Sequence, residues 1–232
     1  MNQPRKVLLL IGSPRGERSN SYAIGKFLVN KLEEKGLLPE EAFAARLVNT
    51  QKGAERLLRS VDNADIIVLA TPLYVDSLPS PTIKALELIF EHRKAVFSTK
   101  SQMLVAIMNS GFPEKEQMDI ALKIIQNFAQ ESNFKWGGGI RVGWGMALNS
   151  EPLKEKKGMT RKLTAGLSLA SVNLSEGQPI SKEAEELAST LFLPLFVAKS
   201  VSRLFGNRGW NKLAKDNNAQ AKMCDRPCEL NQ

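Results

Sequence analysis

Three short apolar runs constrain most strongly what this chain can fold into. They are Lys6–Ile11, Asp65–Ala70 and Gln102–Met108. Runs this short are typical of strands buried on both faces of a sheet. The segments between them have the spacing of amphipathic helices, which would cover such a sheet. The sequence therefore predicts repeated β-α-β units and a parallel sheet with helices on both faces.

Two further strands complete the predicted sheet, a weak one at Phe43–Val48 and another at Gly138–Val142. The predicted helices of this part are Ser21–Lys35, Ala54–Val61, Pro81–His92 and Glu114–Glu131. We expect the first helix to turn Ile24, Phe27, Leu28 and Leu32 inward, and the last to turn Ile120, Ile124 and Phe128 inward. Five strands in this sequence suggest the flavodoxin-like order 2-1-3-4-5, in which ligands bind beyond the carboxyl ends of strands 1 and 3.

The pattern changes near residue 150. We expect residues 1–150 to form the α/β core, and residues 151–232 to form a helical extension. Its predicted helices are Arg161–Leu174 and Ser181–Leu204, the second broken by Pro194. The apolar stretch from Leu191 onward exceeds what one helix usually buries, so we expect it to pack on the core or at a subunit interface. The simplest such assembly is a homodimer.

Composition excludes several classes of protein. The net charge is +8, but no helix-turn-helix, zinc or RNP pattern accompanies it, so no nucleic-acid partner is expected. The longest apolar stretch, Leu191–Ala198, is too short to cross a membrane. No secretory signal is recognisable. Cys224 and Cys228 lie too close together in the sequence to stabilise the fold as a disulfide framework, so a reducing compartment and a cytoplasmic location are expected. With His92 as the single histidine, a metal site is not expected either.

The loop after the first strand reads Gly12-Ser-Pro-Arg-Gly-Glu-Arg-Ser-Asn-Ser21. A phosphate monoester needs hydroxyl and N–H donors, and a helix N-terminus supplies free N–H groups and a favourable dipole. The candidate groups are on Ser13, Arg15 or Arg18, Ser19, Asn20 and Ser21. The loop is neither a Walker A motif nor G-x-G-x-x-G, which argues against ATP and against NAD held in the Rossmann manner. Read alone, it also fits a serine-rich helix cap.

Two more loops should open at the same edge of the sheet. The first, Ala70-Thr-Pro-Leu-Tyr-Val-Asp-Ser-Leu-Pro-Ser-Pro81, is stiffened by prolines and offers Tyr74 as a flat wall for a planar ring. The second is Met108-Asn-Ser-Gly-Phe-Pro113, where Gly111 permits close approach of a ligand and the neighbouring amide and hydroxyl suit polar ring atoms. Read alone, the loop at residues 70–81 also fits a rigid connector with Tyr74 partly in the core. The loop at residues 108–113, read alone, also fits a plain turn.

Taken together, Gly12-Ser-Pro-Arg15 with Ser19-Asn-Ser21, Pro72-Leu-Tyr74 with Asp76-Ser-Leu-Pro79, and Asn109-Ser-Gly-Phe-Pro113 resemble the NAD(P)H-dependent FMN reductase family of flavodoxin-like proteins. The resemblance implies FMN as cofactor and NAD(P)H as reductant. It assigns the phosphate to Ser13, Arg15, Ser19, Asn20 and Ser21. It places the ring between Pro72, Leu73, Tyr74 and Val75 on one side and Asn109, Ser110, Gly111 and Phe112 on the other. The iron–sulfur cluster of some relatives is not expected, because the chain has only two cysteines, both near its C-terminus.

The resemblance implies hydride transfer from NAD(P)H to bound FMN, and then reduction of a small acceptor such as a quinone, a flavin or a nitro or azo compound. Such a ping-pong reaction requires no side-chain acid or base, so no catalytic residue is expected. An FMN-carrying electron-transfer protein is the main alternative, although such carriers tend to be shorter and acidic. A regulatory module that keeps the fold without flavin is a third interpretation.

Overall fold

In this computed structural model, placement is described for residues 4–95, 100–153, 158–190, 211 and 215–217. The chain divides into two compact units, Met1–Phe192 and Leu193–Gln232. The sheet and the helices discussed below belong to the first unit. None of the helices in the described part of the chain is long and apolar enough to cross a membrane.

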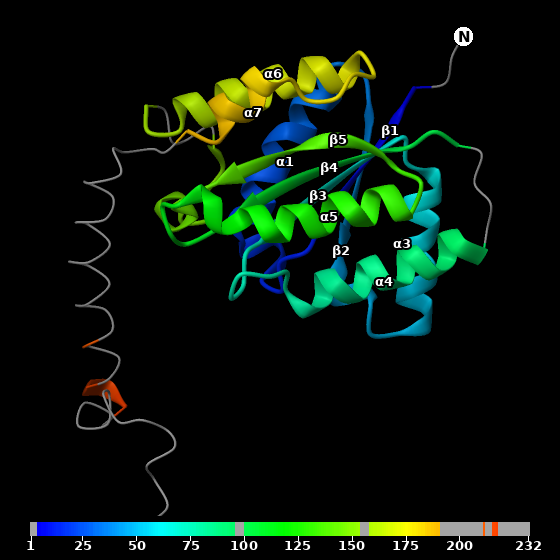
Figure 1. Ribbon diagram of the computed structural model, residues 1–232, viewed down its shortest axis with the longest axis horizontal. Helices are drawn as coiled ribbons and strands as arrows, with labels where there is room; N and C mark the ends of the chain where they lie inside the picture. The colour runs from blue at the N-terminus through cyan, green and yellow to red at the C-terminus, as the bar shows by residue number, and fades with distance from the viewer. Residues whose placement is uncertain (1–3, 96–99, 154–157, 191–210, 212–214, 218–232) are drawn as a thin grey trace, which may run out of the picture. The chain divides into compact units, whose positions relative to one another are not determined.

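The first unit is built on a five-stranded parallel sheet in the order β2-β1-β3-β4-β5 (Figure 1). The strands are β1 Lys6–Ile11, β2 Leu38–Phe43, β3 Ile66–Pro72, β4 Met103–Asn109 and β5 Lys135–Val142. This is the flavodoxin-like topology that the sequence predicts. Every residue of β4 is buried, as expected for a strand covered on both faces.

The second strand lies earlier in the chain than the sequence pattern predicts. Residues 38–43 pair with β1, whereas most of the predicted segment Phe43–Val48 forms the short helix α2, Ala44–Leu47. As an edge strand, β2 is only half-buried and carries Glu40 and Glu41. Both carboxylates have partners: Ser60 Oγ donates to Glu40, and Lys26 Nζ lies 2.5 Å from Glu41 Oε1. Two adjacent acidic residues hide the apolar pattern by which a strand is recognised.

Helices cover both faces of the sheet (Figure 1). The alternate β1 residues Val7, Leu9 and Ile11 pack in one apolar cluster with α1, α6 and α7. Leu8 and Leu10 face the opposite cluster, with α3, α4 and α5. These helices are α1 Asn20–Glu33, α3 Gln51–Asn63, α4 Ser80–Ala95, α5 Asp119–Glu131, α6 Arg161–Ser175 and α7 Lys182–Ala188. Short 3-10 helices lie at η1 Gly16–Arg18, η2 Lys115–Met118 and η3 Gly145–Leu148.

The inward face of α5 differs from the prediction. Ile120 and Ile124 are 69% and 43% exposed, and the buried positions are Ala121, Ile125 and Ala129. Phe128, the third residue predicted to face inward, is partly buried against the core. The fully buried residues have the same helical spacing one position later than the predicted ones. Small alanines let the helix approach the sheet closely, so a set of large apolar residues does not by itself mark its buried face. For α1 the prediction holds, since Ile24, Leu28 and Leu32 are fully buried and Phe27 partly so.

The two C-terminal helices of the unit lie on the same face as α1. The first, α6, matches the predicted helix within a residue. The second begins as predicted, because the Ser181 hydroxyl accepts a bond from the Ala184 N–H at 3.2 Å, but it ends at Ala188. The remainder of that predicted helix from residue 191, including Pro194, lies outside the described residues, as do Cys224 and Cys228.

A buried polar cluster ties the amino ends of the strands together. Arg93 is 8% exposed and donates to the carbonyl of Ser132 at 2.5 Å and to Oε1 of Gln102 at 2.5 Å. Gln102 Nε2 in turn donates to the carbonyls of Val61 and Ala64. Burial lowers the pKa of the Arg93 guanidinium. The cluster joins the segments that lead into β3, β4 and β5, at the edge of the sheet opposite to the loops that carry the candidate site.

Candidate functional site

The three loops singled out in the sequence meet at the carboxyl ends of β1, β3 and β4. Together they line a pocket of ≈ 140 Å³. Its lining residues are Ser13, Arg15, Ser19, Asn20, Ser21, Pro72, Leu73, Tyr74, Asn109, Ser110 and Gly111. As far as the described residues go, the lining contains no carboxylate and consists of neutral groups and one arginine. The topology therefore brings together residues nearly 100 positions apart in the chain.

The N-terminus of α1 opens into this pocket. Ser19 caps the helix: its hydroxyl donates to the carbonyl of Gly16 at 2.6 Å and accepts from the Tyr22 N–H at 3.1 Å. The N–H groups at the start of a helix have no intrahelical acceptors, and those of Asn20 and Ser21 meet no acceptor among the residues the structure describes. The hydrogen-bond donors of this loop that remain available to a ligand are therefore mainly backbone N–H groups, and only to a lesser extent hydroxyl groups.

Two hydrogen bonds fix the orientation of the polar side chains beside these donors. The Ser21 hydroxyl donates to Oδ1 of Asn109 at 2.6 Å, which ties α1 to the end of β4. Oδ1 of Asn20 accepts from the N–H of Ser150 at 2.6 Å. Each asparagine thus uses its oxygen within the protein, and its amide NH₂ is the group left to donate to a ligand.

The start of the first loop is locked by two threonines. Thr82, in the first turn of α4, donates from Oγ1 to the carbonyl of Gly12 at 3.0 Å, and its hydroxyl lies 3.1 Å from that of Thr71. A Cβ at Gly12 would lie 2.2 Å from Thr82 Oγ1 and 2.8 Å from Thr71 Oγ1. Glycine is therefore required by close packing at this position, where the chain leaves β1 for the pocket.

The second loop contains a tight turn at residues 74–77. Tyr74 and Ser77 exchange two backbone hydrogen bonds of 2.9 and 3.1 Å, and the residues between them, Val75 and Asp76, have φ of 47° and 59°. Two positive φ angles define a type I′ turn, which favours asparagine and glycine. A β-branched residue is strained there, yet Val75 is 98% exposed and has no packing contact to compensate.

The third loop is held by the segment that follows β5. The N–H of Gly145 donates to the carbonyl of Ser110 at 2.7 Å, and the N–H of Trp144 donates to that of Phe112 at 2.7 Å. The Ser110 hydroxyl also donates to the Phe112 carbonyl at 2.9 Å. A Cβ at Gly145 would lie 3.1 Å from Nδ2 of Asn109, so the glycine leaves room beside that amide.

Most of the residues selected from the sequence line the pocket, and two do not. Val75 points into solvent at the tip of its turn, and Phe112 is 64% exposed. Three positioning residues were missed in the sequence. Thr82, Gly145 and Ser150 act through single hydrogen bonds or close contacts from segments without a motif, so no local signal marks them.

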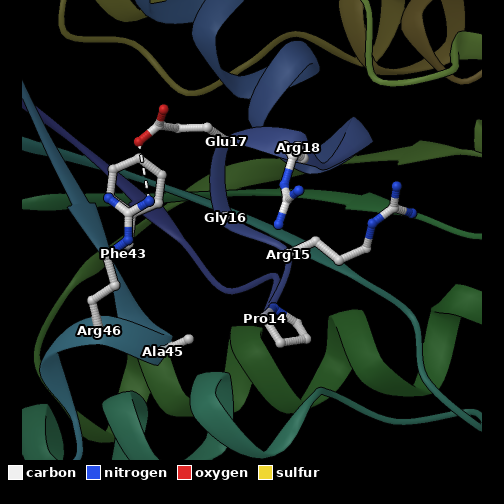
Figure 2. A pocket seen from close by; sticks show the side chains of 8 residues that line it. All are labelled: Pro14, Arg15, Gly16, Glu17, Arg18, Phe43, Ala45 and Arg46. Carbon is white, nitrogen blue, oxygen red and sulfur yellow. Dashed lines mark hydrogen bonds and ion pairs between the residues drawn. The ribbon is translucent and has the colours of Figure 1, made fainter.

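A larger pocket of ≈ 350 Å³ lies on the other side of the first loop (Figure 2). It is lined by Pro14, Arg15, Gly16, Glu17, Arg18, Phe43, Ala45 and Arg46. Arg15 lines both pockets, so the two are adjacent. The ring of Tyr22 packs against Phe43, which lines this larger pocket, and burial raises the pKa of the Tyr22 hydroxyl. In the described part of the chain, no group of three His, Cys, Asp or Glu side chains is arranged to hold a metal.

Fold and site together define a flavodoxin-like α/β protein with its pocket at the switch point of the sheet. Solved structures of this fold include an FMN-dependent NADH-azoreductase from Bacillus anthracis in complex with FMN. It is 12% identical, with a TM-score of 0.53, over 74% of this chain and 99% of that one. The structure of RosB with a bound riboflavin-phosphate intermediate is 13% identical, with a TM-score of 0.56, over 86% of each chain. An NAD(P)H:quinone oxidoreductase from Methanothermobacter marburgensis is 14% identical, with a TM-score of 0.50, over 64% of this chain and 92% of that one.

A sequence profile of the NADPH-dependent FMN reductases matches residues 5–129, more than half of the chain. No curated protein sequence matches significantly. The chain therefore belongs to the NADPH-dependent FMN reductase family. It is an oxidoreductase of that type, with FMN as its cofactor and NAD(P)H as its reductant.

Proposed function

We propose that the ≈ 140 Å³ pocket holds FMN, with the phosphate at the N-terminus of α1 and the ring between the second and third loops. One observation carries the proposal: unspent N–H groups of Asn20 and Ser21 lie in the same pocket as amide and hydroxyl groups from two other strand ends. A helix N-terminus with free N–H groups favours a dianionic phosphate. Among the described residues that line the pocket there is no carboxylate, which favours a phosphate further.

The residues present fit this cofactor. Asn20, Ser21 and Ser13 supply donors for one terminal phosphate, and Arg15 supplies a compensating charge. The amide of Asn109 and the loop at Ser110 offer polar contacts for a ring edge. The pocket is smaller than most cofactor sites, so part of the ring would lie against the exposed Tyr74 and Phe112 at its rim.

When bound, FMN accepts a hydride from the reduced nicotinamide and supplies the electrons for a second substrate. The protein contributes binding and orientation: the first loop fixes the phosphate, and the Ser21–Asn109 bond fixes the spacing between the phosphate end and the ring end of the pocket. The open rim at Tyr74 and Phe112 would admit the nicotinamide and then a small acceptor in turn. We propose a quinone, a free flavin or a nitro or azo compound as the acceptor, in a ping-pong reaction.

Steady-state kinetics test this function. With NAD(P)H varied at several fixed concentrations of a quinone, we expect parallel double-reciprocal lines. Bound flavin released by denaturation should be FMN and not FAD. Lines that intersect would contradict the ping-pong scheme. Reduction of the bound flavin without turnover of any small acceptor would instead favour an electron-transfer protein.

A further inference from the structure

The pocket on the outer side of the first loop carries more positive charge than the proposed FMN site uses, because only Arg15 is shared between the two pockets. Three arginines line it, Arg15, Arg18 and Arg46, with Glu17 as the single acid. Arg46 Nη2 lies 3.1 Å from Glu17 Oε1, and both side chains are more than half exposed. One acid against three cations leaves the pocket with a net positive charge.

The arginines come from two elements that face each other. In Figure 2, Arg46 projects from the segment after β2 toward Glu17, and Arg18 extends from η1 on the other side of Gly16. Arg15 extends away from Arg46 in Figure 2 and also lines the smaller pocket. An anion between η1 and α2 would therefore meet guanidinium groups from both sides.

An aromatic ring completes this pocket. The guanidinium of Arg46 lies 4.4 Å from the centre of the Phe43 ring. Gly16 has φ of 56°, and a Cβ there would lie 3.6 Å from Arg46 Nη2 and 3.7 Å from Phe43 Cδ1. The missing side chain keeps open the space beside the stacked pair. Both a planar guanidinium and an aromatic ring are faces on which a purine base can stack.

We propose that this pocket binds the adenosine end of NADPH through its 2′-phosphate, and thereby selects NADPH over NADH; this rests on the proposed function of the adjacent pocket. A phosphate monoester beside a flat base is the chemistry that Arg18, Arg46 and Phe43 match, because guanidinium groups pair with phosphate in bidentate geometry. NADH has no phosphate at this position. Arg15 lines both pockets, so a dinucleotide could place its two ends in neighbouring sites.

The phosphate of FMN itself fits this second pocket less well. In the described part of the chain, no serine, threonine or asparagine lines this pocket, and its cations belong to exposed side chains. The unspent N–H groups at Asn20 and Ser21 belong to the smaller pocket. A loosely held, partly solvated phosphate is suited to a substrate that must enter and leave.

The test compares Arg46→Gln with Glu17→Gln, and with Arg59→Gln as a matched control that removes an exposed arginine of α3 lining neither pocket. Calorimetry measures binding of adenosine 2′,5′-bisphosphate, with adenosine 5′-monophosphate as the probe that lacks the 2′-phosphate. Losing one charge-assisted hydrogen bond should weaken the bisphosphate at least about tenfold in Arg46→Gln. Glu17→Gln removes the competing acid and should tighten binding about twofold. Arg59→Gln should leave binding unchanged.

Kinetics and flavin titration supply the second readout. The ratio of kcat/KM for NADPH to that for NADH should fall about tenfold in Arg46→Gln and rise in Glu17→Gln. Equal binding of the two adenosine probes by the wild-type protein, or an equal loss for both nucleotides, would overturn the proposal. An FMN affinity that falls as much as bisphosphate binding would also overturn it, by assigning the pocket to the flavin. Intact bisphosphate selectivity in a protein that oxidises neither nucleotide would support the pocket and refute the proposed function.

Discussion

At the scale of single residues, the site depends on which donors are already used within the protein. The hydroxyl of Ser19 donates to the carbonyl of Gly16, and that of Ser21 donates to Oδ1 of Asn109. Both serines were selected from the sequence as phosphate donors, and both line the pocket. In the structure, the Ser19 hydroxyl caps α1 and the Ser21 hydroxyl links α1 to the end of β4. A sequence shows which side chains carry hydroxyl groups, but the acceptor of each hydroxyl is a matter of tertiary structure.

Asn20→Ala tests the phosphate site most directly. The change removes an amide donor from the pocket, and we expect the affinity for FMN to fall at least about tenfold, since a hydrogen bond to a charged group contributes about 1.5–3 kcal/mol. Riboflavin, which lacks the phosphate, should lose much less. Fluorescence titration of both ligands measures the difference. Asn30→Ala, further along α1 and outside the pocket, is the control. Equal losses for both flavins would show that Asn20 does not contact the phosphate.

Val75→Asn tests the strained turn. Asparagine tolerates positive φ far better than a β-branched residue, and Val75 has almost no buried surface to lose. We expect the free energy of unfolding to rise by about 0.5–1 kcal/mol. Urea denaturation measures the change. Val75→Thr keeps the β-branch while adding polarity and should bring no gain; equal stabilisation by threonine would attribute the effect to polarity instead of strain.

At the scale of elements, the sequence predicts the buried strands and the boundary signals better than the exposed faces. The apolar runs of β1, β3 and β4 are long enough to be read directly, because both sides of each strand are covered. Strand β2 and part of the inward face of α5 were misplaced, since β2 is a half-exposed edge and α5 is buried at Ala121, Ile125 and Ala129. The local pattern of apolar residues fails where an edge strand carries acidic residues and where alanines form part of the buried face. The contacts of Thr82 and Ser150 with the first loop have no local pattern at all.

The packing of α6 against α7 gives an element-scale prediction. A Cβ at Gly166 would lie 2.3 Å from the backbone nitrogen of Ala188. Alanine is the better helix former by about 1 kcal/mol, yet we expect Gly166→Ala to lower the free energy of unfolding by about 1–3 kcal/mol, because the backbone of α7 must move. Chemical denaturation measures it. Ser168→Ala, on the same helix at a half-buried position, should leave stability nearly unchanged. A higher free energy of unfolding for Gly166→Ala would contradict this prediction, because it would mean that α6 and α7 can move apart without loss of stability.

At the scale of the whole molecule, the described unit leaves several large apolar side chains exposed. Ile120 and Ile124 lie one turn apart on α5, and Phe112 is exposed in the third loop. Exposed apolar groups on neighbouring turns are often covered in an assembly. The sequence favours the same conclusion from its C-terminal apolar stretch, which lies outside the described residues.

We therefore expect self-association, most simply as a two-fold dimer. Sedimentation equilibrium at micromolar concentration should give twice the chain mass of 25.6 kDa. Ile120→Asp, which places a negative charge on the exposed face of α5, should weaken the dimer if that face is buried in it. Gln130→Asp makes the same change of charge at an exposed polar position of the same helix and serves as the control. A mass that stays at that of one chain throughout would contradict the dimer.

The Arg93–Gln102 cluster has a consequence for how this protein can change. It lies at the amino edge of the sheet, and every residue proposed to contact flavin lies at the carboxyl edge. In many enzymes the groups that bind a substrate are also points of weakness, so gains in robustness are made at the expense of turnover. Here the tolerance of the fold to heat or to further mutation can be adjusted at one edge while the opposite edge is left untouched. Substitutions that broaden the range of acceptors can therefore accumulate at the loops, with their destabilising effects offset from the far side of the sheet.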